Sequence, residues 1–259
     1  MKKLILSILF IVCLSSQASA LGPMMLLIGG SCIPDCTGTT LCQNFEGTGY
    51  DNSESWTPTE TASGTVDEDA LSSTVGSPSG WCANALATVT TSSSDVASIE
   101  NSGGDLGDIP ISYWRIEFVL VSHSLANTER NSIIEVYNNA WTALFRIFIN
   151  NDNGDLEILM LSYYDGSGHE LKSIAHLSTG VKYRVEVKWD TTNDLWAWRL
   201  DGVDQPNNTD GTDPVESEGA LTTNNGADEV EVGQLTTGNA AVIYIDRFAL
   251  STTGWIGDQ

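Results

Sequence analysis

Aromatic residues in polar loops are the side chains of this sequence best suited to binding a polar ligand. Trp141 follows the polar run 138–140, and Tyr163 and Tyr164 stand directly before Asp-Gly at 165–166. Sugars present flat C–H faces that stack on exposed rings, while polar groups bind their hydroxyls. We therefore take Trp141, Tyr163 and Tyr164 as candidate ligand-binding residues.

The segment 183–202 (YRVEVKWDTTNDLWAWRLDG) predicts a β-hairpin. Apolar and charged residues alternate on both sides of the polar turn 190–194, as they do in a half-buried antiparallel sheet. Trp196 and Trp198 share one face of the second strand. They could form a stacking platform for a ligand, but we favour the core, where large aromatic residues are usually buried.

The same alternation recurs along most of the chain, and no segment after the first twenty residues has a sustained helical period. Asn153-Gly154, between two apolar alternating runs, predicts a tight hairpin turn. The acidic, Thr- and Gly-rich stretches 51–69 and 201–229 are expected to be long loops. We predict an all-β fold, an antiparallel jelly-roll β-sandwich that forms a single domain over residues 41–259. The expected strands are 41–45, 81–89, 96–99, 113–121, 133–137, 143–149, 156–163, 173–177, the hairpin, 230–233 and 241–251.

Residues 1–20 have the pattern of a signal peptide. Lys2 and Lys3 precede the apolar run 4–14, and Ala-Ser-Ala at 18–20 is a typical cleavage signal. We expect a mature chain that begins at Leu21 and is secreted to the periplasm, the cell surface or the extracellular medium. No later stretch is long and apolar enough for a membrane helix, so no membrane insertion is expected.

Four cysteines remain in the expected mature chain, Cys32, Cys36, Cys42 and Cys82. An even number in an oxidising compartment favours two disulfides. Binding of a metal by four thiolates is the alternative, but the paired C-x-x-C spacing of such sites is absent. Cys42 and Cys82 each fall in an early strand, so we predict the pairs Cys42–Cys82 and Cys32–Cys36.

Residues 21–40 comprise the cysteine cluster and, before it, a short apolar tail, Leu21–Gly30. The tail is expected to cover one end of the sandwich as a strand or plug, because domain ends are usually tied down or disordered. The alternative is strand donation to a second subunit.

The charge of the chain is strongly acidic. Loss of Lys2 and Lys3 leaves 9 Lys and Arg residues against 34 Asp and Glu residues, a formal charge of −25. Such a field repels nucleic acid, favours solubility and attracts divalent cations. We therefore expect no nucleic-acid partner.

A family resemblance rests on four sequence segments: YRVEVKWD and LWAWRLDGV in the hairpin, CQNFEGTGYDN from Cys42, and VIYIDRFALS from Val242. They resemble laminin-G-like domains of the concanavalin A-like lectin/glucanase superfamily, and the two end segments also resemble sandwich carbohydrate-binding modules. The resemblance implies a secreted sandwich that binds a glycan or polysaccharide. It also implies a structural Ca²⁺ held by Glu46 and Asp246, since calcium prefers carboxylate and carbonyl oxygens. The family often has a second acid after the late Asp, where this chain has Arg247, so an Arg247–carboxylate pair is the alternative.

Support for catalysis is thin, and we assign no catalytic residue. Glycoside hydrolysis needs two carboxylates at a fixed separation. The hydrolases of the superfamily carry them in the motif E-x-D-x-x-E on one strand, and this motif does not occur here. Arg115-Ile116-Glu117 matches only the first element of alginate-type lyases. His123, His169 and His176 could act as bases, but none lies in a motif.

The sequence thus predicts a secreted, lectin-like protein that binds an extracellular or cell-surface glycan. A self-assembling structural or adhesive surface protein, forming an oligomer or filament, is the first alternative, because of the apolar tail. A polysaccharide lyase or glycoside hydrolase with non-standard residues is the second.

Overall fold

The structure is a computed structural model that describes residues 39–43, 45, 56–71, 84–92, 94–101, 106–163, 167–206, 217–218, 226–235 and 240–256. The chain divides into two compact units, Met1–Pro34 and Asp35–Gln259, and every described residue belongs to the second. All regular elements in this described part are β-strands. Within it, no helix has the length and apolar character needed to cross a membrane.

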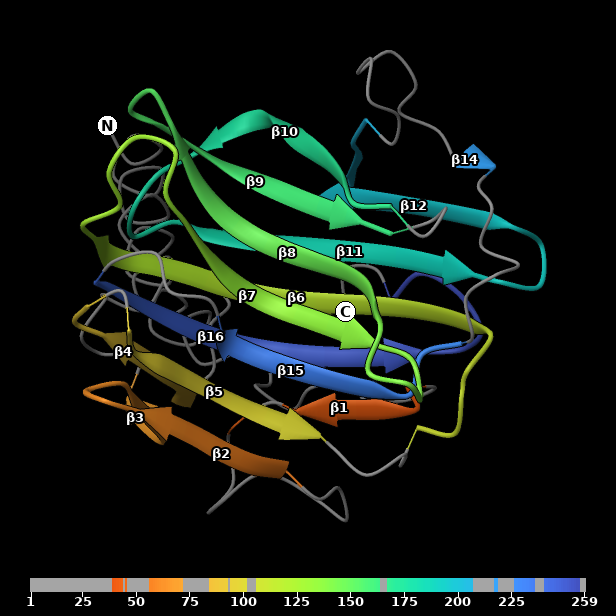
Figure 1. The fold of residues 1–259 in the computed structure, drawn as a ribbon, viewed down its shortest axis with the longest axis horizontal. Coiled ribbons are helices and arrows are strands. Elements are labelled where there is room, and N and C mark those ends of the chain that lie inside the picture. The colour runs from red at the N-terminus through yellow and green to blue at the C-terminus, as the bar shows by residue number, and fades with distance from the viewer. Residues whose placement is uncertain are drawn as a thin grey trace, which may run out of the picture. The chain divides into compact units, whose positions relative to one another are not determined.

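The strands form two antiparallel sheets that pack face to face (Figure 1). The nine-stranded sheet has the order β13-β12-β11-β6-β16-β4-β3, with β1 paired to β16 and β14 paired to β12. Its strands are β1 (Leu41–Gln43), β3 (Thr65–Leu71), β4 (Asn84–Thr90), β6 (Ile111–His123), β11 (Lys182–Asp190), β12 (Leu195–Leu200), β13 (Val203–Asp204), β14 (Ser217–Glu218) and β16 (Ala241–Ser251).

The seven-stranded sheet lies in front of it in Figure 1, in the order β10-β9-β8-β7-β15-β5-β2. Its strands are β2 (Trp56–Thr61), β5 (Val96–Asn101), β7 (Arg130–Tyr137), β8 (Ala143–Asp152), β9 (Asp155–Ser162), β10 (His169–Leu177) and β15 (Glu229–Gln234). Strands adjacent in the sheet but distant in the chain, such as β7, β15 and β5, bring together residues that the sequence separates widely. The predicted antiparallel β-sandwich is confirmed.

The core between the sheets is built from alternate residues of the strands. Trp196 and Trp198 of β12 are fully buried, which confirms that they belong to the core and are no ligand platform. The hairpin is also confirmed, because Trp189 of β11 pairs directly with Trp196. The largest fully buried side chains are Trp114, Trp189, Trp196, Trp198, Phe45, Phe118, Phe145 and Phe248.

The predicted turn at Asn153-Gly154 joins β8 to β9. Asn153 and Gly154 have φ angles of 56° and 101°, the left-handed values that the tightest hairpin turns require. The turn fixes the register in which Asp152 opposes Asp155. It thereby decides which residues of β8 face outward.

The prediction that residues 51–69 form a loop is wrong for 56–61 and 65–69, which belong to β2 and β3. These two strands are the last of their sheets in the strand order, at edges where polar residues are tolerated. Their threonines are β-branched and favour extended backbone. The short strands β13 and β14 likewise lie within the stretch 201–229 that was expected to be a loop.

Candidate functional site on the outer face of the seven-stranded sheet

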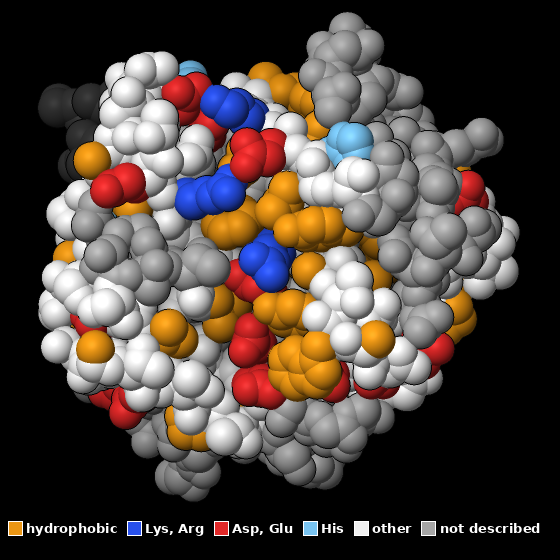
Figure 2. Space-filling view, in the orientation of Figure 1, with side chains coloured by type: hydrophobic (Ala, Val, Ile, Leu, Met, Phe, Trp, Pro, Cys, Tyr) orange, Lys and Arg blue, Asp and Glu red, His pale blue; other side chains and the backbone are white. Residues whose placement is uncertain are grey.

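The outer face of the seven-stranded sheet carries a band of charged, polar and hydrophobic side chains, visible across the middle of Figure 2. Along β8 the outward residues are Arg146, Phe148, Asn150 and Asp152, which alternate with core residues such as Ile147. At the rise of an extended strand, the four outward positions span about 20 Å. This length suits an extended ligand that lies along the strand.

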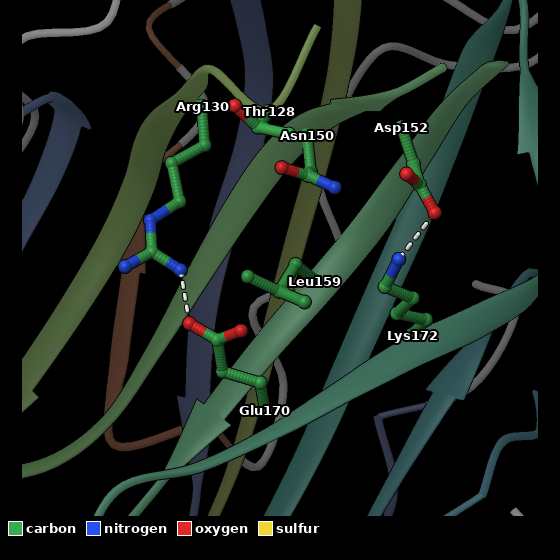
Figure 3. A pocket seen from close by; sticks show the side chains of 7 residues that line it. All are labelled: Thr128, Arg130, Asn150, Asp152, Leu159, Glu170 and Lys172. Carbon is green, nitrogen blue, oxygen red and sulfur yellow. Dashed lines mark hydrogen bonds and ion pairs between the residues drawn. The ribbon is translucent and has the colours of Figure 1, made fainter.

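A pocket of about 350 Å³ lies at one end of this band (Figure 3). Two ion pairs border it: Arg130 Nη1 lies 2.5 Å from Glu170 Oε1, and Lys172 Nζ lies 2.5 Å from Asp152 Oδ2. Leu159 points between the two pairs in Figure 3. The pocket is lined by Thr128, Arg130, Asn150, Asp152, Leu159, Glu170 and Lys172.

The floor of the band is apolar even though it belongs to the outer face. Phe148 and Leu159 are direct cross-strand partners, and each is buried. The guanidinium carbon of Arg130 lies 4.7 Å from the centre of the Phe148 ring, so the cation covers the ring in a cation–π contact. An apolar floor bordered by a few oriented polar groups is the usual composition of a small-ligand site.

Beyond this floor, a row of charged residues crosses four strands. Glu231 of β15 is the direct partner of Glu100 on β5 and of Glu135 on β7, and Glu135 is the partner of Arg146 on β8. Side chains at directly opposed positions lie about 5 Å apart at Cβ, and like charges in such pairs destabilise the sheet. The row therefore holds three carboxyl groups against one guanidinium.

Tyr137 connects two of these carboxyl groups. Its hydroxyl oxygen lies 2.5 Å from Glu135 Oε2 and 3.2 Å from Glu231 Oε2. Arg146 Nε also lies 3.0 Å from Glu135 Oε2. Glu135 therefore has both a hydroxyl donor and a cation beside the same carboxylate oxygen.

The electrostatics of the row favour a proton on its central member. Burial raises the pKa of Glu231 to about 7, and repulsion by Glu135 and Glu100 adds to the shift, while the contact with Tyr137 and the charge of Arg146 oppose it. Burial also raises the pKa of the Tyr137 hydroxyl, as does its hydrogen bond to Glu135, so the phenol keeps its proton. At neutral pH this face presents an acid group whose charge changes with small changes in pH.

Trp141 lies beside this row and is exposed over 51% of its surface. Its ring centre is 5.4 Å from that of Tyr137. Asn138 holds the turn that carries it, because its side-chain Oδ1 accepts hydrogen bonds of 3.0 Å from the backbone N–H groups of both Ala140 and Thr142. The φ angle of Trp141 is 56°, a left-handed value that costs a residue with a Cβ about 1–2 kcal/mol. Strain of this kind is often retained at functional positions.

Tyr163, the other candidate ligand-binding residue among those described, lies at the same end of β8 as Trp141. Its backbone N–H donates a 3.0 Å hydrogen bond to the carbonyl of Leu144, and its side chain is half-buried. Tyr164 lies outside the described residues. Trp141 and Tyr163 thus both come from the end of the band opposite the pocket, and their role in ligand binding stays a prediction.

The predicted calcium ligand Asp246 is buried on β16, while Glu46 lies outside the described residues. Lys182 Nζ lies 3.0 Å from Asp246 Oδ2, and Arg247 Nε lies 4.0 Å from the same oxygen. Asp246 Oδ1 is buried and accepts no hydrogen bond within the described part of the chain, so one oxygen remains for a cation. No group of three or more His, Cys, Asp or Glu residues among those described is arranged to hold a metal. Calcium at Glu46 and Asp246 stays a prediction.

The motif Arg115-Ile116-Glu117 does not belong to the candidate site. It lies on β6 of the nine-stranded sheet, where both charged side chains are buried and Arg115 Nε is 3.6 Å from Glu117 Oε1. The lysine ammonium of Lys182 also contacts Glu117. Burial disfavours the charge of Glu117, but these ion pairs outweigh it and lower its pKa.

Cys42 lies in β1, whereas Cys32, Cys36 and Cys82 lie outside the described residues, so the pairing of the four cysteines stays a prediction.

The acidic row was missed by the sequence reasoning. Glu100, Glu135 and Glu231 lie on three separate strands, and each has the pattern of an outward polar residue between core residues. Only the register between strands shows that they meet.

Neither a protein-family model nor a curated protein matches the sequence. Several solved structures are similar to the chain. The carbohydrate esterase of the Shiga toxin-encoding bacteriophage phi24B superposes with a TM-score of 0.55 at 12% identity, covering 83% of this chain and 99% of that chain. The binding domain of botulinum neurotoxin DC, solved with rat synaptotagmin II, gives 0.56 at 6% identity over 83% of this chain and 48% of that one.

The globular domain of T. cruzi calreticulin is also similar, with a TM-score of 0.52 at 9% identity, covering 83% of this chain and 88% of that chain. At these identities the likeness shows the fold alone. The fold is thus one shared by proteins with different activities, and function has to be argued from the site.

Proposed function

We propose that this protein is a secreted, lectin-like member of the concanavalin A-like superfamily that binds a glycan on the outer face of the seven-stranded sheet. The observation that carries the proposal is the band along β8. It combines an exposed tryptophan, Trp141, with an apolar floor at Phe148 and Leu159 and with charged groups at both ends. Rings for stacking and oriented polar groups for hydroxyls are what a sugar needs.

The charge of the molecule favours an uncharged glycan. Acids exceed bases by 34 to 11 in the full sequence, and in the pocket each basic side chain is paired with a carboxylate. A surface of this kind repels sulfated polymers. Binding should rest on stacking and hydrogen bonds and should survive moderate salt, because salt screens long-range charge effects. A weakly acidic glycan would bind through a bridging cation.

The fold likeness to a phage protein described as a carbohydrate esterase supports a carbohydrate ligand without naming one. Binding is favoured over catalysis because the sequence lacks the E-x-D-x-x-E motif of the superfamily's hydrolases, and because Arg115-Ile116-Glu117 lies on the other sheet. Release of reducing or unsaturated ends from a polysaccharide would instead favour the enzyme alternative. Filaments or large oligomers on a sizing column would favour the structural one.

The test is a glycan array probed with the purified mature protein and with Trp141→Ala. We expect retention of one or more neutral glycans by the wild type and a loss of about 5- to 150-fold in affinity for the variant, since stacking on an aromatic ring contributes about 1–3 kcal/mol. The fold of Trp141→Ala should be unchanged by circular dichroism, because the ring is exposed.

Trp255→Ala is the matched control. Trp255 is a half-buried tryptophan that packs on Tyr113 of the nine-stranded sheet, with ring centres 5.5 Å apart. Its removal should leave glycan affinity unchanged. Full affinity in Trp141→Ala, or tight and salt-sensitive binding to heparin-like polymers, would contradict the proposal.

A further inference from the structure

We propose that Glu231 takes part in the glycan site as an uncharged carboxylic acid that donates its proton to the Tyr137 oxygen, and that loss of this proton weakens glycan binding. This inference rests on the proposed function and adds a pH-dependent control to the same site. It gives a role to the acidic row, which the binding of a neutral sugar by stacking does not by itself require.

The Tyr137 hydroxyl provides the geometric argument. A hydroxyl has one proton to donate, yet the Tyr137 oxygen lies within hydrogen-bond distance of two carboxyl groups, at 2.5 Å from Glu135 Oε2 and 3.2 Å from Glu231 Oε2. The shorter contact, to the ion-paired Glu135, takes the hydroxyl proton. The longer contact is then a hydrogen bond only if Glu231 is the donor, which requires Glu231 to be protonated.

The groups around Glu231 support the same assignment. On β7 it pairs with Glu135 and its side chain contacts the Tyr137 hydroxyl, and on β5 it pairs with Glu100. Glu229 precedes it by two residues on the same face of β15. Among described residues, the nearest cation of the row is Arg146 on β8, whose Nε lies 3.0 Å from Glu135 Oε2.

Glu229 provides a second, independent observation on this face, a buried carboxylate oxygen without a hydrogen-bond partner among the described residues. It is 5% exposed, and its Oε2 is buried with no hydrogen-bond partner in the described part of the chain. Burial raises its pKa, and repulsion by Asp228 and Glu100 adds to the shift. A buried acceptor without a donor is costly, and a sugar hydroxyl would relieve this cost if the Glu229 side chain turned its oxygen toward the ligand.

Loss of the Glu231 proton would change the site in two ways. The contact with Tyr137 would become repulsive, because both oxygens would then be acceptors. The ionised carboxylate would also be repelled by Glu135 and Glu100 and would swing outward, over the face on which a ring stacked on Trp141 extends. Trp141 packs on Tyr137 at 5.4 Å, so the disturbance reaches the stacking surface directly.

The experiment uses the purified mature protein and three soluble neutral polysaccharides, laminarin, galactomannan and xyloglucan, in affinity electrophoresis at pH 5 and pH 8. With the pKa of Glu231 at about 7, roughly a tenth of the molecules keep the proton at pH 8, so apparent affinity should fall about tenfold from pH 5 to pH 8. Glu231→Gln, whose amide N–H can replace the acid O–H toward Tyr137, should bind equally at both pH values. Asp155→Asn, an exposed acid at the start of β9, is the control and should keep the wild-type pH dependence.

Thermal unfolding at the same pH values gives a readout that needs no ligand. The folded-state pKa of Glu231 lies above its ordinary value of 4.5. Its contribution to stability is therefore fully present below about pH 4.5 and is lost as pH rises through about 7. Glu231→Gln should melt at a higher temperature than the wild type at pH 8, and the difference should shrink at pH 5.

The outcomes separate this inference from the proposed function. Retention that depends on Trp141 but is equal at pH 5 and pH 8 would overturn the inference and leave glycan binding in place. The inference would likewise be overturned if Glu231→Gln and the wild type melted in parallel at the two pH values. Absence of retention by all three polysaccharides at both pH values, together with no binding on the glycan array, would overturn both the inference and the proposed function.

Discussion

The outer faces of the two sheets both carry charged residues, but these differ in burial and in the balance of acids and bases. On the nine-stranded sheet, Arg115, Glu117, Glu186 and Lys188 are all buried. Each acid there has a basic neighbour, as in the 3.5 Å pair between Arg184 Nε and Glu186 Oε2. On the seven-stranded sheet Glu170 and Lys172 are exposed whereas Glu135 is buried, and acids outnumber bases in the row through Glu231.

Two lysines show the difference most directly. Lys182 on the nine-stranded sheet contacts Glu117 and Asp246, and 22% of its side chain is exposed. Lys172 on the seven-stranded sheet contacts Asp152 and Glu157, and 48% of its side chain is exposed. The same motif, one ammonium between two carboxylates, is thus structural on one face and accessible on the other. A buried network of this composition contributes to the stability of the fold, whereas an accessible one can also contact a ligand.

The largest expected effect tests this contrast with one substitution on each face. Lys182→Met should lower the free energy of unfolding by about 3 kcal/mol, because it leaves two buried carboxylates without their ammonium partner. Lys172→Met should lower it by less than about 1 kcal/mol, because exposed ion pairs contribute little. Urea denaturation of both variants measures the difference. Equal losses would show that burial does not distinguish the two faces.

A smaller effect concerns the calcium that the termini are proposed to hold. If Glu46 and Asp246 bind Ca²⁺, a hundredfold excess of calcium over its Kd stabilises the fold by about 2.7 kcal/mol. Chelation should then lower the melting temperature of the wild type and have much less effect on Asp246→Asn. A melting curve that chelator leaves unmoved would contradict this site and leave Asp246 as a member of the ion-pair network alone.

The smallest expected effect on stability is at Trp141, where function and stability should separate. Trp141→Gly removes the left-handed strain of about 1–2 kcal/mol and loses a ring contact of similar size, so the free energy of unfolding should stay within about 1 kcal/mol. Glycan affinity should nevertheless be lost. A strongly destabilised Trp141→Gly would mean that the ring supports the β7–β8 turn instead of a ligand.

Local pattern determined much of the fold. Alternation in 183–202 predicted the hairpin, and the strands from β4 to β12, together with β15 and β16, were placed within a few residues of their observed bounds, whereas the short strands β13 and β14 were missed. The turn at Asn153-Gly154 was predicted because its residue types tolerate left-handed backbone. The strands β2 and β3 were missed because their polar composition resembles a loop, and only pairing with β5 and β4 makes them strands.

The sequence by itself also favoured the core for Trp196 and Trp198, which their burial confirms, and placed Trp141 next to polar residues, since period and neighbouring residue types are local properties. The tertiary structure alone decided that Glu100, Glu231 and Glu135 form one row, because strand register and sheet order join segments distant in the chain. It also decided which charges are buried, since that depends on what packs against each face. The charge state of Glu231 depends on the neighbouring acids of the row and on its burial. Neither of these can be read from the residues next to Glu231 in the sequence.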